Sequence, residues 1–166
     1  MEISIKSFIL FGAVALTGLS AGFFYAWSVS VIPGTQKVTD TTYLETMQSI
    51  NRAILNPAFF LIFFGSIVFL AIGSISQFNA SKITFWLMLT SSIFYLLGTV
   101  GVTALGNVPL NDQLDVLDLG ALTTNKIMEF RKFYETSWNR LHLIRTVFAV
   151  ASFLLSVLAV FTYPKN

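Results

Sequence analysis

Charged residues are distributed very unevenly along this chain, and the stretches without them constrain its fold most. No Asp, Glu, Lys or Arg occurs in residues 7–36, 53–81, 83–111 and 146–164, which are stretches of 30, 29, 29 and 19 residues. An α-helix needs about 20 consecutive apolar residues to cross the hydrocarbon core of a bilayer. Four such stretches in 166 residues predict four transmembrane helices and leave little chain for a soluble domain.

Composition agrees with an integral membrane protein and excludes several kinds of chemistry. Hydrophobic residues make up 55% of the chain and charged residues 11%, whereas about a quarter of the residues of a soluble domain are charged. The chain has no cysteine, which excludes disulfides, thiolate metal sites and Cys-x-x-Cys redox chemistry. A secretory signal is an alternative for the first stretch. Its apolar run from Phe8 to Val31 is longer than the about 7–15 residues of a signal's apolar region, which favours a membrane helix.

The expected fold is all-α: an integral membrane four-helix bundle that forms a single transmembrane domain over residues 1–166. The four helices are predicted at about residues 7–31, 56–76, 83–104 and 138–163. Between the first two, Tyr43, Met47, Ile50 and Ile54 recur at helical spacing, which predicts an amphipathic helix on the membrane surface or folded over the bundle. A long, partly helical segment is expected between the third and fourth helices.

The distribution of lysine predicts the orientation of the bundle. The end with both termini and the link between helices 2 and 3 carries Lys6, Lys82 and Lys165 against Glu2. Because basic residues are enriched in cytoplasmic loops, we expect both termini in the cytoplasm and a bacterial inner (plasma) membrane as the location.

Polar and aromatic side chains gather at the opposite end of the predicted bundle. With helices that alternate in direction, the ends of helices 1 and 3 and the starts of helices 2 and 4 share this face, which predicts a cavity that is polar near the face and lined more deeply by Phe and Tyr. The candidate site residues are Tyr25, Trp27, Asn51, Arg52, Asn56, Asn107, Asn111, Trp138, Asn139, His142 and Arg145.

Helix 4 places three of these residues on one stripe, because Trp138, His142 and Arg145 are separated by four and three residues. Arg145 lies a turn inside the helix, where a charge exposed to lipid costs at least ~3 kcal/mol, so it needs a partner or a polar cavity. His142 should be neutral beside this guanidinium and should meet the ends of helices 1 and 2, near Trp27 and residues 51–56.

The arginines are expected to hold the loop that follows helix 3. We expect Arg52 and Arg145 each to bond to residues 107–112 or to an asparagine of the site. Asp112, Asp115 and Asp118 are spaced by three and could suggest a cation site, but they are better interpreted as solvated loop residues and as partners for the two arginines.

A single histidine limits the metal chemistry that the chain could support. His142 is the only histidine, whereas a two-histidine haem site, or a zinc or non-haem iron site, needs two or more. We therefore predict no metal and no cofactor. Any chemistry should be acid–base and electrostatic, performed on an apolar substrate.

Four sequence blocks resemble the successive motifs of one membrane family. "FFYAWSVSVIPG" (23–34), "YLETMQSINRAILNPAFF" (43–60), "NVPLND" (107–112) and "WNRLHLIRT" (138–146) are similar to those of the anthrone-oxygenase-like family, most of whose bacterial members have no assigned activity. The resemblance implies a four-helix membrane protein and marks as motif positions Pro109 and the candidate residues above. It also implies an oxygenase that converts an anthrone into an anthraquinone without a cofactor.

The residues fit that implied chemistry in named roles. An anthrone carbon is acidic because its carbanion delocalises onto a phenolate-like oxygen, and the anion can react with O₂ without a metal. His142 is the candidate base. Arg145, Asn139, Asn51 and Asn111 are candidate donors to the oxyanion, and Trp27, Trp138 and Tyr25 are candidate walls for a flat ring system.

Three kinds of function remain open from the sequence. The first is a cofactor-independent oxygenase acting on a lipophilic aromatic or quinol-like substrate. The second is a non-catalytic membrane module that binds a lipid, a quinone or a partner helix, and the third is a small transporter. The third is least favoured, because no charged residue lies in the middle of a predicted span. Expected partners are membrane lipid and a lipophilic small molecule, with a homo-oligomer as a further option and no nucleic acid.

Overall fold

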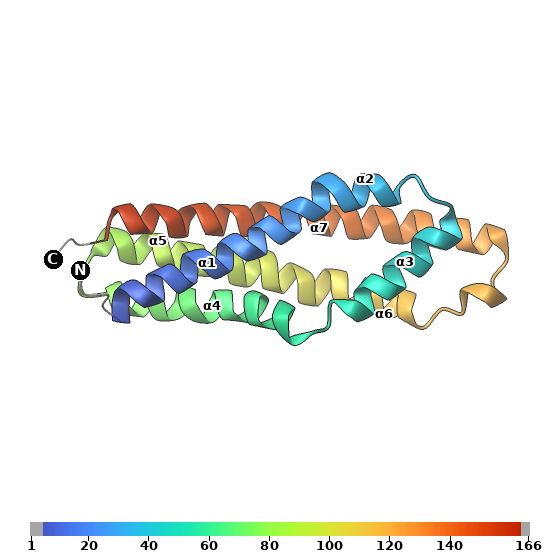
Figure 1. Cartoon of the computed structure of the whole chain (residues 1–166). Helices are drawn as coiled ribbons and strands as arrows, with labels where there is room; N and C mark the ends of the chain where they lie inside the picture. The colour runs from blue at the N-terminus through green and yellow to red at the C-terminus, as the bar shows by residue number, and fades with distance from the viewer. Residues whose placement is uncertain (1–4, 164–166) are drawn as a thin grey trace.

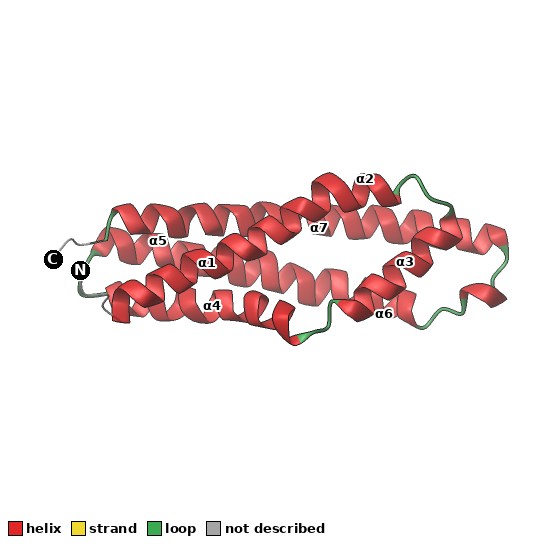
Figure 2. Cartoon of the chain, in the orientation of Figure 1, coloured by secondary structure: helices red, strands yellow, loops and turns green. Residues whose placement is uncertain are grey.

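The computed structural model describes residues 5–163, and these form an all-helical bundle (Figures 1 and 2). Four long helices in this part of the chain, Ile5–Thr35, Pro57–Gln77, Lys82–Asp115 and Thr124–Phe161, are apolar and long enough to cross a membrane. They alternate in direction, so the start of the first long helix, the end of the fourth and the turn between the second and third lie at one end of the molecule (Figure 1). The predicted membrane four-helix bundle is confirmed.

The first long helix extends beyond its predicted end. It comprises α1 (Ile5–Ala26), a π-helical stretch η1 (Trp27–Val31) and α2 (Ile32–Thr35). The end predicted near residue 31 was wrong: Pro33 stands in the first turn of α2, directly after the π-helical turns. Proline is tolerated in the first turn of an α-helical segment, and the helix continues through Pro33 to Thr35.

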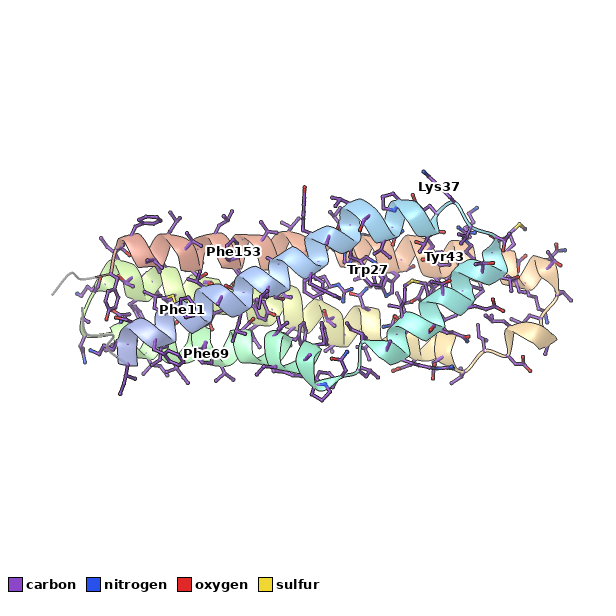
Figure 3. All side chains as sticks on the ribbon, viewed as in Figure 1. Phe11, Trp27, Lys37, Tyr43, Phe69 and Phe153 are labelled. Carbon is purple, nitrogen blue, oxygen red and sulfur yellow. The ribbon has the colours of Figure 1, made fainter. Side chains whose placement is uncertain are left out.

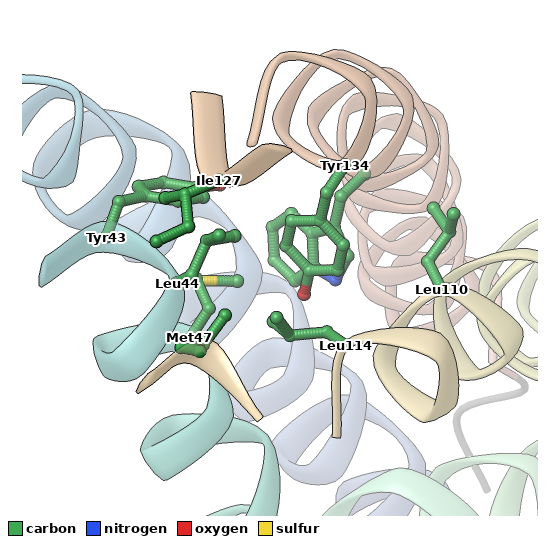
Figure 4. Packing of buried hydrophobic residues seen from close by; sticks show 9 residues of the cluster. Tyr43, Leu44, Met47, Leu110, Leu114, Ile127 and Tyr134 are labelled. Carbon is green, nitrogen blue, oxygen red and sulfur yellow. The ribbon is translucent and has the colours of Figure 1, made fainter. Parts of the chain in front are cut away.

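A separate amphipathic helix, α3 (Asp40–Ala53), follows. Thr39 caps its N-terminus by accepting a hydrogen bond from the backbone N–H of Thr42 at 3.3 Å. Its buried face carries Tyr43, Leu44 and Met47, which pack against residues of α6 and α7 (Figure 4). The helix predicted between the first two spans therefore exists, and it is folded over the end of the bundle.

The second and third long helices form a hairpin. Helix α4 (Pro57–Gln77) begins after Asn56, whose Oδ1 accepts from the N–H of Phe59 at 3.0 Å, and α5 (Lys82–Ile93) begins after Ser81. From α5 the chain continues without a break through two π-helical stretches, η2 (Phe94–Gly101) and η3 (Thr103–Asn107), into α6 (Val108–Asp115). The end predicted near residue 104 was wrong, because Pro109 falls in the first turn of α6 and does not interrupt the helix.

The fourth long helix, α7, runs from Thr124 to Phe161 and contains 38 residues. The segment expected to link helices 3 and 4 is consequently much shorter than predicted: only residues 116–123 lie outside the long helices, and they contain one 3₁₀ turn, η4 (Leu119–Ala121). A 38-residue helix is about 57 Å long, nearly twice the about 30 Å of a hydrocarbon core. The N-terminal part of α7, with α3, α6 and η4, forms a cap beyond one end of the bundle.

The bundle places hydroxyl groups inside and apolar side chains outside. Interior hydrogen bonds join Ser20 Oγ to Tyr95 Oη at 2.7 Å and Ser91 Oγ to Ser152 Oγ at 2.9 Å. Large apolar residues such as Ile75 and Leu97 are exposed on the outside. Lipid favours this distribution, because small and polar residues then mediate contacts between helices. The stripe predicted on helix 4 faces the interior, since Trp138, His142 and Arg145 are buried, and the buried residues Ala149, Ser152 and Ser156 continue it.

Candidate functional site

A cavity of about 300 Å³ lies where the bundle meets the cap. Every long helix and α3 contribute to its wall, and Figure 3 shows Trp27, one of its lining residues, in the half of the molecule away from the termini. Most of the wall is apolar and aromatic: Phe23, Phe24, Trp27, Phe59, Phe60, Phe63, Phe64 and Trp138. Its polar lining residues are Asn51, Arg52, Thr103, Asn111, Asp112, Asp115 and Arg145.

Arg145 places a buried guanidinium group at this cavity. The residue is 8% exposed, and none of the ion pairs formed by residues 5–163 includes it. Its carbon Cζ lies over two aromatic rings, 4.7 Å from the centroid of Phe24 and 5.0 Å from that of Trp138, and both contacts favour a cation. Its Nη1 donates to Thr103 Oγ1 at 3.3 Å. The cation is thus held by rings and neutral acceptors, without a neutralising carboxylate.

His142 supplies the other acceptor for Arg145 and lies behind the cavity wall. Its Nδ1 is 3.2 Å from Arg145 Nε and 3.0 Å from Nη2. A guanidinium group only donates, so Nδ1 carries no proton and the proton of the neutral ring is on Nε2. That Nε2–H points to Phe24 O at 3.1 Å and Ser28 Oγ at 3.0 Å. Both ring nitrogens are therefore engaged.

Stacked aromatic rings fix the position of His142. Its ring is parallel to the indole of Trp138, with 5.0 Å between centroids and 7° between planes. Trp27 approaches the same two rings, 5.8 Å from Trp138 and 6.4 Å from His142. The spacing of four residues between Trp138 and His142 produces the stack, because such residues face one another on a helix.

A chain of hydrogen bonds links the two asparagines that line the cavity. Asn111 Oδ1 accepts from Trp138 Nε1 at 2.9 Å and from Tyr134 Oη at 3.0 Å. Tyr134 Oη in turn accepts from Asn51 Nδ2 at 3.1 Å. Helices α3, α6 and α7 are joined through these side chains, so the cap and the polar wall of the cavity form one unit.

Charged residues lie at the edge of the cavity. Arg52 Nε donates to Asp115 Oδ1 at 2.6 Å, and both side chains are about half exposed or more, at 63% and 48%. Asp112 also lines the cavity, and it forms none of the ion pairs found among the described residues. Asp118 instead accepts from the backbone N–H of Gly120 at 3.1 Å. Asp115 is thus a partner of an arginine and Asp118 a loop residue, as interpreted from the sequence.

The expectation for the two arginines was wrong in its details. Arg52 bonds to Asp115, which lies beyond residues 107–112, and Arg145 bonds to His142 and Thr103. The reason is that α5 and α6 belong to one continuous helix. Residues 107–112 are therefore helical, and the carboxylate that Arg52 contacts is Asp115, at the C-terminal end of α6. The buried guanidinium of Arg145 therefore contacts helix 3 through a hydroxyl group.

Six of the eleven candidate residues line the cavity: Trp27, Asn51, Arg52, Asn111, Trp138 and Arg145. The other five do not. Tyr25 is 59% exposed, and Asn56 caps α4. Asn107 is buried and donates from Nδ2 to Trp138 O at 3.3 Å. Asn139 is half-buried and forms no side-chain hydrogen bond within the described part of the chain, and His142 contacts helix 1 but not residues 51–56.

Tyr134, like the cavity-lining residues Thr103 and Asp112, was not among the candidate site residues. It is fully buried, at 0% exposure, and connects Asn51 to Asn111. Its position four residues before Trp138 would have placed it on the inward stripe of helix 4. The predicted boundary of that helix at residue 138 excluded it. Within residues 5–163, no group of three or more His, Cys, Asp or Glu side chains could hold a metal ion.

Four apolar spanning helices that enclose a cavity with a buried cation define an integral membrane protein of the all-α bundle class. The family model described as "Anthrone oxygenase" matches residues 51–155, which is more than half of the chain. The chain belongs to the anthrone oxygenase family, as its motifs predicted. No curated protein and no solved structure gives a significant match.

Proposed function

We propose that this protein is a cofactor-independent oxygenase that acts on a lipophilic aromatic substrate, of the anthrone or quinol type, in the cavity between bundle and cap. The observation that carries the proposal is the guanidinium of Arg145, which is buried at an aromatic cavity and has no carboxylate partner among the described residues. A cation held in this way stabilises an anion that forms on the substrate, because little water is present to compete.

The reaction would begin with loss of a proton from the carbon opposite the substrate's carbonyl group. The resulting carbanion delocalises its charge onto the carbonyl oxygen, where two N–H groups of Arg145 remain available, since its three hydrogen bonds use three of five. Addition of O₂ to the carbanion forms a C–O bond, and one proton completes a hydroperoxide. Loss of the second C–H proton and cleavage of the O–O bond release water and leave the quinone carbonyl.

The hydrogen bonds of His142 suit a positioning role better than that of a base. Its Nδ1 lone pair is occupied by Arg145, its Nε2 carries the proton, and the ring does not line the cavity. Asp112 lines the cavity and has no ion-pair partner within residues 5–163, so we assign the proton acceptor to Asp112. His142 then orients the guanidinium of Arg145.

Two substitutions of His142 separate these roles. His142→Gln retains an acceptor for Arg145 but cannot act as a base, whereas His142→Phe removes both capacities. If His142 only positions Arg145, the Gln variant keeps turnover of an anthrone under O₂ within about tenfold of the parent, and the Phe variant loses it by about 100-fold, the size expected for a misplaced oxyanion donor. Equal and complete loss in both variants would restore His142 as the base.

The assignment of Asp112 as the proton acceptor has its own test. Asp112→Asn should lower turnover by about 100-fold or more.

A second candidate function is binding without catalysis, and the apolar edge of the cavity favours it. Leu55, Phe60 and Phe64 line the cavity and are also exposed, and Phe60 and Phe64 belong to the spanning helix α4. A lipid or quinone could therefore enter from the membrane. Purified protein that binds an anthraquinone but consumes no O₂ with an anthrone would support this function over the oxygenase.

The location and orientation are proposals as well. The lysine-bearing end with both termini is assigned to the cytoplasm of a bacterial inner membrane, and the cap to the outer face. Membrane lipid and a lipophilic small molecule are the proposed partners. A homo-oligomer and a transport function remain alternatives, the latter disfavoured because no charged residue lies in the middle of a span predicted from the sequence.

A further inference from the structure

The side-chain amide of Asn111 has only one orientation that its neighbours allow. Trp138 Nε1 is a donor and can never accept a hydrogen bond, and it lies 2.9 Å from Asn111 Oδ1. Rotating the amide by 180° would place an NH₂ group against the indole N–H, so that two donors would face each other. The indole of Trp138 therefore fixes Oδ1 of Asn111 toward α7.

Tyr134 transmits this orientation to Asn51. Because Asn111 Oδ1 can only accept, the Tyr134 hydroxyl at 3.0 Å must donate its single proton to it. The Tyr134 oxygen is then an acceptor for its other neighbour, and Asn51 presents Nδ2 to it at 3.1 Å. Tyr134 is 0% exposed, so bulk water does not reach the hydroxyl as an alternative partner.

The remaining atoms of both amides have a defined polarity. Asn51 Oδ1, an acceptor, and Asn111 Nδ2, a donor, form no hydrogen bond within residues 5–163, and both residues line the cavity. The donors of Arg145 lie in the same cavity wall. A ligand that satisfies this wall carries a hydroxyl group for Asn51 and a carbonyl or phenolate oxygen for Asn111 and Arg145.

We propose that Tyr134 is a specificity-determining positioning residue, which holds Asn51 as an acceptor and so selects ligands that bear a free hydroxyl group in addition to a carbonyl or phenolate oxygen. The inference rests on the proposed function to the extent that the ligand is a planar aromatic bound in this cavity. Without the Tyr134 hydroxyl, Asn51 can turn either its oxygen or its NH₂ group to the ligand. A site built to bind a hydroxyl group discriminates against ligands that lack it, and this discrimination depends on the fixed amide.

Two stable probes test the selectivity. The dissociation constants of 2-hydroxyanthraquinone, whose hydroxyl is too far from the carbonyl for an internal hydrogen bond, and of unsubstituted anthraquinone are measured with the purified full chain in detergent, from quenching of the fluorescence of Trp27 and Trp138, which line the cavity. We expect the parent to prefer the hydroxylated probe by about fivefold, the factor that corresponds to one neutral hydrogen bond. Tyr134→Phe should remove this preference while both probes still bind.

Tyr43→Phe is the matched control. Tyr43 is as deeply buried, at 2% exposure, its ring lies 6.4 Å from that of Tyr134, and it does not line the cavity. Its hydroxyl forms no hydrogen bond within the described residues, and burial raises its pKa, so the group is neutral at physiological pH. Removing this hydroxyl should leave the preference unchanged.

Asn51→Leu decides the question independently of Tyr134, including the case in which Tyr134→Phe does not fold. This substitution removes the acceptor itself and should abolish the preference as completely as Tyr134→Phe does. Combining Asn51→Leu with Tyr134→Phe should cause no further loss. A preference that survives in Tyr134→Phe or in Asn51→Leu would overturn the inference. Equal binding of both probes by the parent would overturn it and leave the proposed function standing, whereas a parent that binds neither probe would refute both.

Discussion

Replacing Arg145 with methionine separates stability from function at this site. Arg145 is 8% exposed and has no carboxylate partner within residues 5–163, so no unpaired acid is left behind when the guanidinium is removed. Breaking a buried ion pair costs about 3–5 kcal/mol, because the remaining charge loses its partner. That cost does not arise for Arg145→Met, and we expect a much smaller change in the free energy of unfolding.

The magnitude follows from the contacts of Arg145. Removing an unneutralised charge from the protein interior recovers about 3 kcal/mol. Against this, His142 Nδ1 loses its donor, which costs about 1–2 kcal/mol. The contacts of the guanidinium with Phe24 and Trp138 are also lost, at about 0.5–1 kcal/mol each. These gains and losses nearly cancel, so the free energy of unfolding should change by no more than about 1 kcal/mol. Methionine fills most of the space of the arginine, so no large cavity adds to the cost.

Unfolding in detergent, followed by tryptophan fluorescence, measures the stability of Arg145→Met. Titration with a phenolate ligand measures its binding, and O₂ consumption with an anthrone measures its turnover. We expect a melting temperature within a few degrees of the parent, together with a loss of turnover of about 100-fold, as for removal of an oxyanion donor. A loss of 3 kcal/mol or more would mean that Arg145 has an anionic partner in the folded protein. Unchanged binding and turnover would refute its assignment to the substrate oxyanion.

Three further predictions concern packing, charge and topology. Gly98→Ala should destabilise the protein by about 1–3 kcal/mol, because a Cβ at Gly98 would overlap an aromatic ring of α7. The control Gly22→Ala should cost much less, since a Cβ there meets no atom within 4 Å. The exposed pair Arg52–Asp115 should contribute less than about 1 kcal/mol in a double-mutant cycle, and a larger coupling would contradict its classification as a solvated ion pair. A reporter fused after Asn166 should behave as cytoplasmic, whereas an extracytoplasmic signal would reverse the proposed orientation.

The sequence by itself determined the membrane bundle and most of the polar wall of the cavity. Charge cannot remain exposed to lipid, so four stretches without charge require four spans whatever their packing. Helical spacing then placed Trp138, His142 and Arg145 on one inward face, because this relation depends only on the local geometry of α7. The family motifs selected the same residues, and the match over residues 51–155 confirmed the family.

The tertiary structure decided where the helices end and which atoms face the cavity. The predicted helix ends at residues 31 and 104 precede Pro33 and Pro109, but both prolines follow π-helical turns in helices that continue. The continuous helix carries Asp115 to Arg52 and leaves Arg145 without a carboxylate within the described residues. Arg145, three residues from His142 on the same helix, donates to Nδ1, whereas the acceptor for Nε2–H is Phe24 O of helix 1, 118 residues away in sequence. Local sequence does not determine the partner of Arg52 or the acceptor of Nε2–H, because both depend on contacts between helices that only the packed bundle brings together.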